Sequence, residues 1–248
     1  MSDRTRLLLR AARAYAEAGA HEDAARCYDL LGLSWTAAES YRQAGDPAQA
    51  AESYRRAGRP EDAARCFRAL GRPDLAARCR QEHDDFLGAA WEHLLAGQPR
   101  RAEPLLRSAD GQGTHGPGVN GPAALRLRLA RQVSALLLDG TREPLLALLP
   151  KVEEGLTGAG AVRERVVLME WGVEAADLLT RFDWGARLFH TAHRSLPLGA
   201  VHRAVVLARW QEWALRRLGS TAWLPAGGAL DDLGGDRPSG VGDAFAGR

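Results

Sequence analysis

Two histidines in the second half of this 248-residue chain are the best candidates for chemistry at a metal ion. His190 and His193 stand three residues apart, a spacing that brings two side chains to one face of a helix. His202 follows them and Glu174 and Asp177 precede them, so a metal-dependent hydrolase is one hypothesis. The spacing differs from the H-E-x-x-H pattern of zinc hydrolases, so histidines that bind no metal are the simpler interpretation. We predict no metal, no cofactor and no catalytic residue.

The three cysteines share one position of a 13-residue pattern, and they do not form a recognisable reactive site. Cys27, Cys66 and Cys79 each precede an aromatic or arginine position, and Ser40 and Ser53 occupy the same position elsewhere. A position that accepts cysteine and serine indicates a small packing slot, whereas a catalytic cysteine needs a base and an orienting group. The odd number and the absence of C-x-x-C spacing predict neither a disulfide framework nor a zinc site. A reducing, cytoplasmic location is therefore expected.

A glycine-rich segment at 107–121 contains the pattern G-x-G-x-x-G at Gly111, Gly113 and Gly116. Dinucleotide binding requires this pattern between a strand and a helix. Here a helical pattern precedes it, and no strand is predicted. The composition indicates a flexible linker instead.

Arginines at one repeated position are the candidate partner-binding residues of the first half. These residues, with one neighbour, are Arg42, Arg55, Arg56 and Arg68. Pairing with Glu39 and Glu52 one turn away would make an ordinary mixed charged surface. The alternative is a groove for an acidic peptide, because arginine makes bidentate contacts with carboxylates. If successive helices alternate between two layers, only Arg42 and Arg68 share a surface.

Trp210 and Trp213 are the candidate partner-binding residues of the second half. They lie three residues apart in a helical pattern, with Val206 on the same face. Packing in the core is one interpretation. The other is a partner-facing surface, since tryptophan is enriched at interface hot spots.

The elements that must position these residues follow from an internal repeat. Ala-Ala pairs begin at positions 11, 24, 37, 50, 63, 76 and 89, which are 13 residues apart. An aromatic residue follows at Tyr15, Tyr28, Tyr41, Tyr54 and Phe67. Glycine follows at Gly19, Gly32, Gly45, Gly58 and Gly71 and returns at Gly97, with proline at Pro47, Pro60, Pro73 and Pro99. Fixed spacing of this kind is typical of a repeat architecture.

Each repeat predicts one short helix of about 11 residues, about 16 Å long. Glycine ends the helix in the left-handed conformation, and proline suits the first turn of the next helix. Asp46 is a plausible N-cap. Because such short helices are unstable alone, they must bury their apolar stripes against neighbours. The sequence therefore predicts an all-α protein, an α-solenoid of stacked antiparallel helical hairpins.

The phrases "AAxxYxxAG" between Ala11 and about Gly97 resemble tetratricopeptide-like (TPR-like) repeats. The resemblance is to the short-helix form of soluble NSF attachment proteins and of coatomer and intraflagellar-transport solenoids. Two units here make 26 residues, whereas a standard tetratricopeptide pair has about 34. The resemblance implies a scaffold that binds a protein or peptide without catalysis, alone or as a subunit of a larger assembly.

The expected organisation has four parts: a short-helix repeat stack at 1–108, a flexible Gly-rich linker at 109–121, longer-helix hairpins at 122–218 and a disordered Gly-rich tail at 219–248. The pattern weakens after Ala76, and 73–96 is expected to be one longer helix bent near Gly88. Breaks in the second half predict five helices at about 122–139, 141–156, 161–180, 183–195 and 199–218. Asp183 is the expected N-cap of the fourth.

The overall composition limits the classes of partner. The formal net charge is +2, with 33 basic and 31 acidic residues, and no apolar run is long enough for a membrane helix. The arginine, alanine and glycine content is typical of a GC-rich bacterial genome. We expect a cytoplasmic, non-catalytic adaptor for a protein partner and no membrane partner. A helical-repeat nucleic-acid binder is the alternative, although such binding usually needs a basic stripe.

Overall fold

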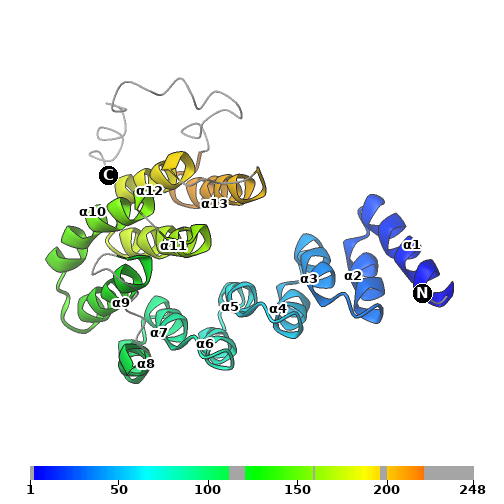
Figure 1. Ribbon diagram of the computed structural model, residues 1–248, viewed down its shortest axis with the longest axis horizontal. Helices are drawn as coiled ribbons and strands as arrows, with labels where there is room; N and C mark the ends of the chain where they lie inside the picture. Colours follow the sequence, from blue (N-terminus) through cyan, green and yellow to red (C-terminus); the bar gives the residue numbers. More distant parts are fainter. Residues whose placement is uncertain (1–2, 112–120, 159, 196–199, 221–248) are drawn as a thin grey trace. The chain divides into compact units, whose positions relative to one another are not determined.

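The computed structural model describes residues 3–111, 121–158, 160–195 and 200–220 (Figure 1). The secondary structure in these ranges consists of α-helices without strands, which confirms the all-α prediction. The chain divides into two compact units, Met1–Gln112 and Gly113–Arg248. Within each unit, consecutive helices pack against each other.

The first unit is a stack of short helices joined by tight turns. Its described helices are α1 (Asp3–Glu17), α2 (His21–Leu30), α3 (Ser34–Gln43), α4 (Pro47–Arg56), α5 (Pro60–Ala69), α6 (Pro73–Gln81), α7 (Phe86–Leu95) and α8 (Pro99–Gly111). Turns of three or four residues reverse the chain between neighbours, so successive helices form antiparallel hairpins. This confirms the helical solenoid expected from the 13-residue repeat. Helix α8 runs three residues beyond the expected end of the stack at 108.

The turns between these helices use the residues that the repeat supplies. Gly45 has a φ of +77°, and the amides of Gly45 and Asp46 donate to carbonyls in the last turn of α3 at 3.2 and 2.9 Å. The Asp46 carboxylate then accepts hydrogen bonds from the amides of Ala48 and Gln49 at 3.1 and 3.0 Å. The predicted N-cap is therefore confirmed, and Pro47 opens the first turn of α4.

The expectation of one long helix over 73–96 is wrong, because α6 ends at Gln81 and α7 begins at Phe86. Asp84 stands at the glycine position of the repeat and takes up its left-handed conformation, with a φ of +57°. Aspartate adopts this conformation more readily than most residues with a side chain. Asp85 then caps α7, and its carboxylate accepts a 2.9 Å hydrogen bond from the amide of Gly88. The 13-residue period thus continues although its glycine is lost.

The Ala-Ala pairs and the aromatic residues form the core of the first unit. The pairs of α2 to α6 are buried, as are Tyr28, Tyr41 and Tyr54. Two tyrosine hydroxyls donate to acidic residues of the preceding helix, Tyr41 to Asp29 at 3.3 Å and Tyr54 to Glu39. Small alanines let the helices approach closely, and the rings fill the space between them. Burial, and then the contact with Glu39, raise the pKa of Tyr54.

The second unit consists of longer helices. Its described helices are α9 (Pro122–Asp139), α10 (Glu143–Thr157), α11 (Val162–Leu178), α12 (Phe182–Ser195) and α13 (Ala200–Leu218). Each end lies within two residues of the expected position, so the five-helix prediction is confirmed. Helix α9 packs on α10 and α11, and α12 packs on α10, α11 and α13. The linker positions 112–120 and the tail from 221 lie outside the described residues.

The prediction that Asp183 caps the fourth helix of the second half is wrong. Helix α12 begins one residue earlier, at Phe182. Asp183 therefore lies inside the first turn, where its carboxylate accepts hydrogen bonds of 2.8 and 2.6 Å from the Arg181 guanidinium.

Thr180 carries backbone strain in the turn between α11 and α12, with a φ of +58°. The left-handed conformation costs a β-branched residue roughly 1–2 kcal/mol, whereas glycine adopts it freely. We expect Thr180→Gly to raise the free energy of unfolding of the second unit by about 1 kcal/mol after glycine's entropic cost. Urea unfolding followed by circular dichroism measures this. Thr180→Ala keeps the strain and should show no comparable gain; equal effects of the two substitutions would contradict the prediction.

Candidate functional site

Two of the four predicted partner-binding arginines form local ion pairs on the surface. Arg42 pairs with Glu39 at 2.9 Å, and Arg55 pairs with Glu52 at 2.7 Å. In both pairs the two residues lie three positions apart on one helix, as the interpretation of a mixed charged surface predicts. Exposed pairs of this kind contribute at most about 1 kcal/mol. The guanidiniums of Arg42 and Arg55 are therefore bound to carboxylates of their own helices, and a ligand carboxylate could displace these at a small cost in free energy.

The other two predicted arginines link helices that are not consecutive in the chain. Arg56 of α4 donates to Asp29 of α2 at 2.9 Å. Arg68 of α5 donates to Glu92 of α7 at 2.9 and 3.0 Å. Each pair joins two helices separated by one intervening helix. Both arginines thus hold the stack together internally.

Glu92 is the centre of a buried ionic cluster that the sequence analysis did not identify. Its side chain is 0% exposed, and it accepts hydrogen bonds from Arg68 and, at 2.9 Å, from Arg80 of α6. Arg80 also donates to Asp85 at 2.8 Å. Burial alone would lower the pKa of Arg80, but the charges of Glu92 and Asp85 outweigh it and raise the pKa.

A signal for this cluster is present in the repeat. Glu92 occupies the small slot that holds Cys66 and Cys79 in earlier helices, and Arg80 occupies the aromatic position. Glu92 and Arg80 carry opposite charges, lie in adjacent helices and stand at positions that are buried in most of the other repeats, so they indicate a compensating pair. A comparison of repeats position by position finds both residues.

The structure places Trp210 and Trp213 in the core of the second unit, where they are 5% and 4% exposed. Phe189 of α12 stacks on Trp210 with centroids 6.0 Å apart and lies 5.7 Å from Trp213. The Trp213 indole N–H donates to Asp177 at 2.9 Å. These contacts are those of core packing, one of the two interpretations considered for this pair.

Within the described part of the chain, His190 and His193 do not belong to a group of metal ligands. Among the described residues, no three histidine, cysteine, aspartate or glutamate side chains are placed to hold a metal ion. Asp177 is engaged by Trp213 and by Arg217 at 2.9 Å, and the side chain of His202 lies outside the described residues. His190 lies edge-on to the Trp210 ring, and burial lowers its pKa.

The cysteines and the glycine motif likewise show no reactive geometry in the described part of the chain. Cys66 and Cys79 are buried free thiols, and burial raises the pKa of both, which disfavours the nucleophilic thiolate. Gly111 ends helix α8, and Gly113 and Gly116 lie outside the described residues.

A cluster of exposed apolar side chains surrounds the turn between α2 and α3. Leu30, Leu33 and Trp35 are 67%, 43% and 52% exposed and lie within six residues of one another. We call these three residues the Trp35 cluster. The five other turns between α1 and α7 hold equivalent residues at steps of 13. They are Glu17, Gln43, Arg56, Ala69 and Glu82 for Leu30; Ala20, Asp46, Arg59, Arg72 and Asp85 for Leu33; and Glu22, Ala48, Glu61, Asp74 and Leu87 for Trp35.

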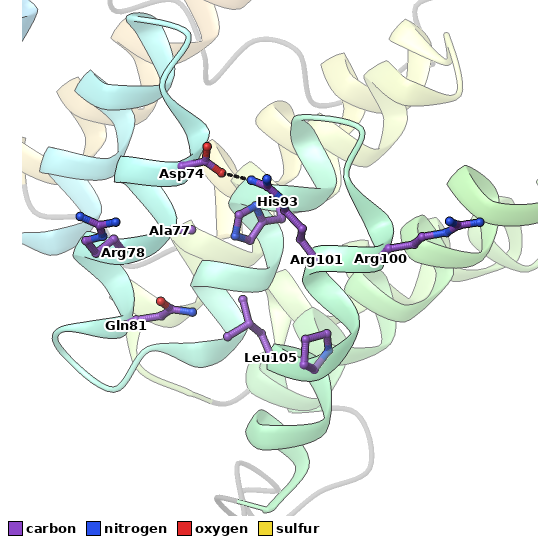
Figure 2. A pocket seen from close by; sticks show the side chains of 9 residues that line it. Asp74, Ala77, Arg78, Gln81, His93, Arg100, Arg101 and Leu105 are labelled. Carbon is purple, nitrogen blue, oxygen red and sulfur yellow. Dashed lines mark hydrogen bonds and ion pairs between the residues drawn. The ribbon is translucent and has the colours of Figure 1, made fainter.

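A groove with a volume of about 640 Å³ lies between α6 and α8 (Figure 2). Its lining comes from three helices: Asp74, Ala77, Arg78 and Gln81 of α6, His93 of α7, and Arg100, Arg101, Pro104 and Leu105 of α8. The guanidinium of Arg101 pairs with the Asp74 carboxylate from one wall to the other. We call this the α6–α8 groove.

Comparisons with known proteins assign no family to this chain. A scan against protein-family models, a search of curated proteins and a search of solved structures each gave no significant match. The relation to tetratricopeptide repeats therefore stays a prediction. Within the described ranges, none of the helices has the length and apolar character needed to cross a membrane.

Proposed function

We propose that this protein is a non-catalytic, TPR-like scaffold that holds a partner protein in the bacterial cytoplasm. The observation that carries the proposal is the Trp35 cluster, which exposes three large apolar side chains at one turn of the first unit. Three free cysteines support the reducing location. The partner would bury the tryptophan and leucines against its own apolar surface.

The repeat supplies an internal comparison for this surface. At the positions equivalent to Leu30, Leu33 and Trp35 in the five other turns, polar or small residues predominate; Leu87 is the single large apolar residue at these positions, and its side chain is buried. The fold therefore does not require apolar residues at these exposed positions. Tryptophan is enriched at interface hot spots, where a few desolvated side chains supply most of the binding energy. A docking role explains why one turn departs from the others.

No observation in the described residues favours the two alternative functions. The four candidate partner-binding arginines are paired with carboxylates, which reduces their attraction for phosphate. The described surroundings of the two histidines considered for a hydrolase, His190 and His193, contain no group of metal ligands.

The test is quantitative capture of partners by the tagged full chain from its source organism, with matched variants. We expect Leu30→Ser/Leu33→Ser and Trp35→Ala each to reduce recovery of a near-stoichiometric partner at least tenfold, which corresponds to about 1.4 kcal/mol. Leu138→Ser/Leu215→Ser is the control, because these leucines of the second unit are also more than half exposed. Equal recovery with all variants would refute docking at the Trp35 cluster.

A further inference from the structure

The α6–α8 groove lies where the repeat loses its aromatic residue. The position that holds buried Tyr28, Tyr41 and Tyr54 in earlier helices holds His93 in α7. The smaller imidazole lines the groove, and its Nδ1 atom lies 3.1 Å from the Gln98 side-chain oxygen. Apolar surface from Ala77, Pro104 and Leu105 completes the lining.

The charged side chains of the groove are predominantly basic. Three arginines line it against one carboxylate, that of Asp74. The side chains of Arg78 and Arg100 extend from α6 and α8 in opposite directions, so their guanidiniums lie at the two outer edges of the groove (Figure 2). Neither pairs with a carboxylate among the described residues, in contrast to Arg42, Arg55, Arg56 and Arg68. The outer edges of the groove therefore offer guanidinium groups that the fold itself leaves available.

Arg101, the third arginine of the groove, is bound only weakly by its ion pair with Asp74. The side chains of Asp74 and Arg101 are 62% and 60% exposed, and ion pairs this exposed are weak because water screens the two charges. A carboxylate from a ligand can therefore replace Asp74 at little cost. Arginine favours such replacement, because its planar group binds carboxylates through two parallel hydrogen bonds.

We propose that the α6–α8 groove binds an acidic peptide segment of a partner protein. Its carboxylates contact Arg78, Arg100 and Arg101, and its small apolar side chains lie on Ala77, Pro104 and Leu105. Single-stranded nucleic acid fits the groove less well, because its described lining contains no phenylalanine, tyrosine or tryptophan for base stacking. The groove is separate from the Trp35 cluster, so either site can fail its test without the other.

Fluorescence anisotropy on the full chain tests this with three labelled probes. They are a 12-residue peptide of alternating glutamate and alanine or leucine, the same peptide with glutamine for glutamate, and a 12-nucleotide oligothymidine. We expect the acidic peptide alone to bind well and to bind more weakly as salt rises, since its contacts are ionic. Tighter binding of the oligothymidine, equal binding of the glutamine peptide, or no binding of the acidic peptide would overturn the proposal.

Matched variants separate the groove from general surface charge. Arg78→Glu/Arg100→Glu should weaken binding of the acidic peptide at least tenfold. Arg4→Glu/Arg13→Glu makes the same change in net charge on α1, at exposed arginines without a carboxylate partner in the described chain, and should change binding less than threefold. Asp74→Asn should tighten binding by freeing Arg101, whereas Asp3→Asn should not. Equal effects within either pair would overturn the assignment to this groove.

Discussion

Glu92→Gln is expected to lower the free energy of unfolding of the first unit by about 3 kcal/mol. The substitution removes a buried negative charge and leaves Arg80, which is itself 5% exposed, paired with Asp85 as its remaining carboxylate among the described residues. Breaking a buried pair by removing one partner costs about 3–5 kcal/mol, and the remaining Asp85 places this case at the lower end. Urea unfolding followed by circular dichroism gives the loss. Hydrogen exchange should show faster opening of α5, α6 and α7.

Glu52→Gln is the matched control for this prediction. Glu52 makes the same kind of bond to Arg55, but both side chains are 45% exposed, so the change should stay within about 0.5 kcal/mol. Arg80→Met/Glu92→Leu removes both charges together and should restore most of the stability, because apolar residues can replace a buried pair. Similar losses for Glu52→Gln and Glu92→Gln would show that burial of the cluster does not matter.

Trp213→Ala is expected to destabilise the second unit by about 3–5 kcal/mol, the usual cost of deleting a large aromatic side chain from a core. The ring packs against Phe189, and a Cβ atom at Gly185 would lie 2.5 Å from its Cζ2 atom, so the site is tightly filled. The loss should appear as a lower urea midpoint and a lower melting temperature.

Two further variants show what the Trp213 side chain contributes. Trp213→Phe keeps an aromatic ring but loses the hydrogen bond to Asp177, so it should cost less than Trp213→Ala. Trp35→Ala deletes a tryptophan that is 52% exposed, and we expect a loss of about 1 kcal/mol from its smaller buried area. If Trp213→Ala cost no more than Trp35→Ala, the packing around Trp213 would not be as described.

The helices of this protein could be predicted because their limits depend on local chemistry. Glycine at a positive φ, aspartate at an N-cap and proline in a first turn act within a few residues, as Gly45, Asp46 and Pro47 show. The long helix expected over 73–96 was wrong because the prediction required glycine, whereas Asp84 adopts the same backbone conformation. The signal lay in the period of 13 residues, which continues through that turn.

The candidate surfaces could be predicted only in part. Arg42 and Arg55 pair with glutamates three residues away, a distance that helix geometry alone determines. The partners of Arg56 and Arg68 lie 27 and 24 residues away, so they depend on which helices become neighbours in the stack. The Trp35 cluster and the α6–α8 groove also depend on that stacking, because exposure is a property of the packed structure.

The sequence by itself determined the helices, their period and the small and aromatic residues between them, since these follow from backbone conformation and helical spacing. Only the tertiary structure decided which tryptophan is buried and which is exposed. Trp213 is covered because α12 packs over it, and Trp35 is exposed because it stands at a turn of the stack. The burial of a side chain and its ion pairs across helices depend on neighbours that are distant in the sequence. Local sequence patterns therefore do not predict them.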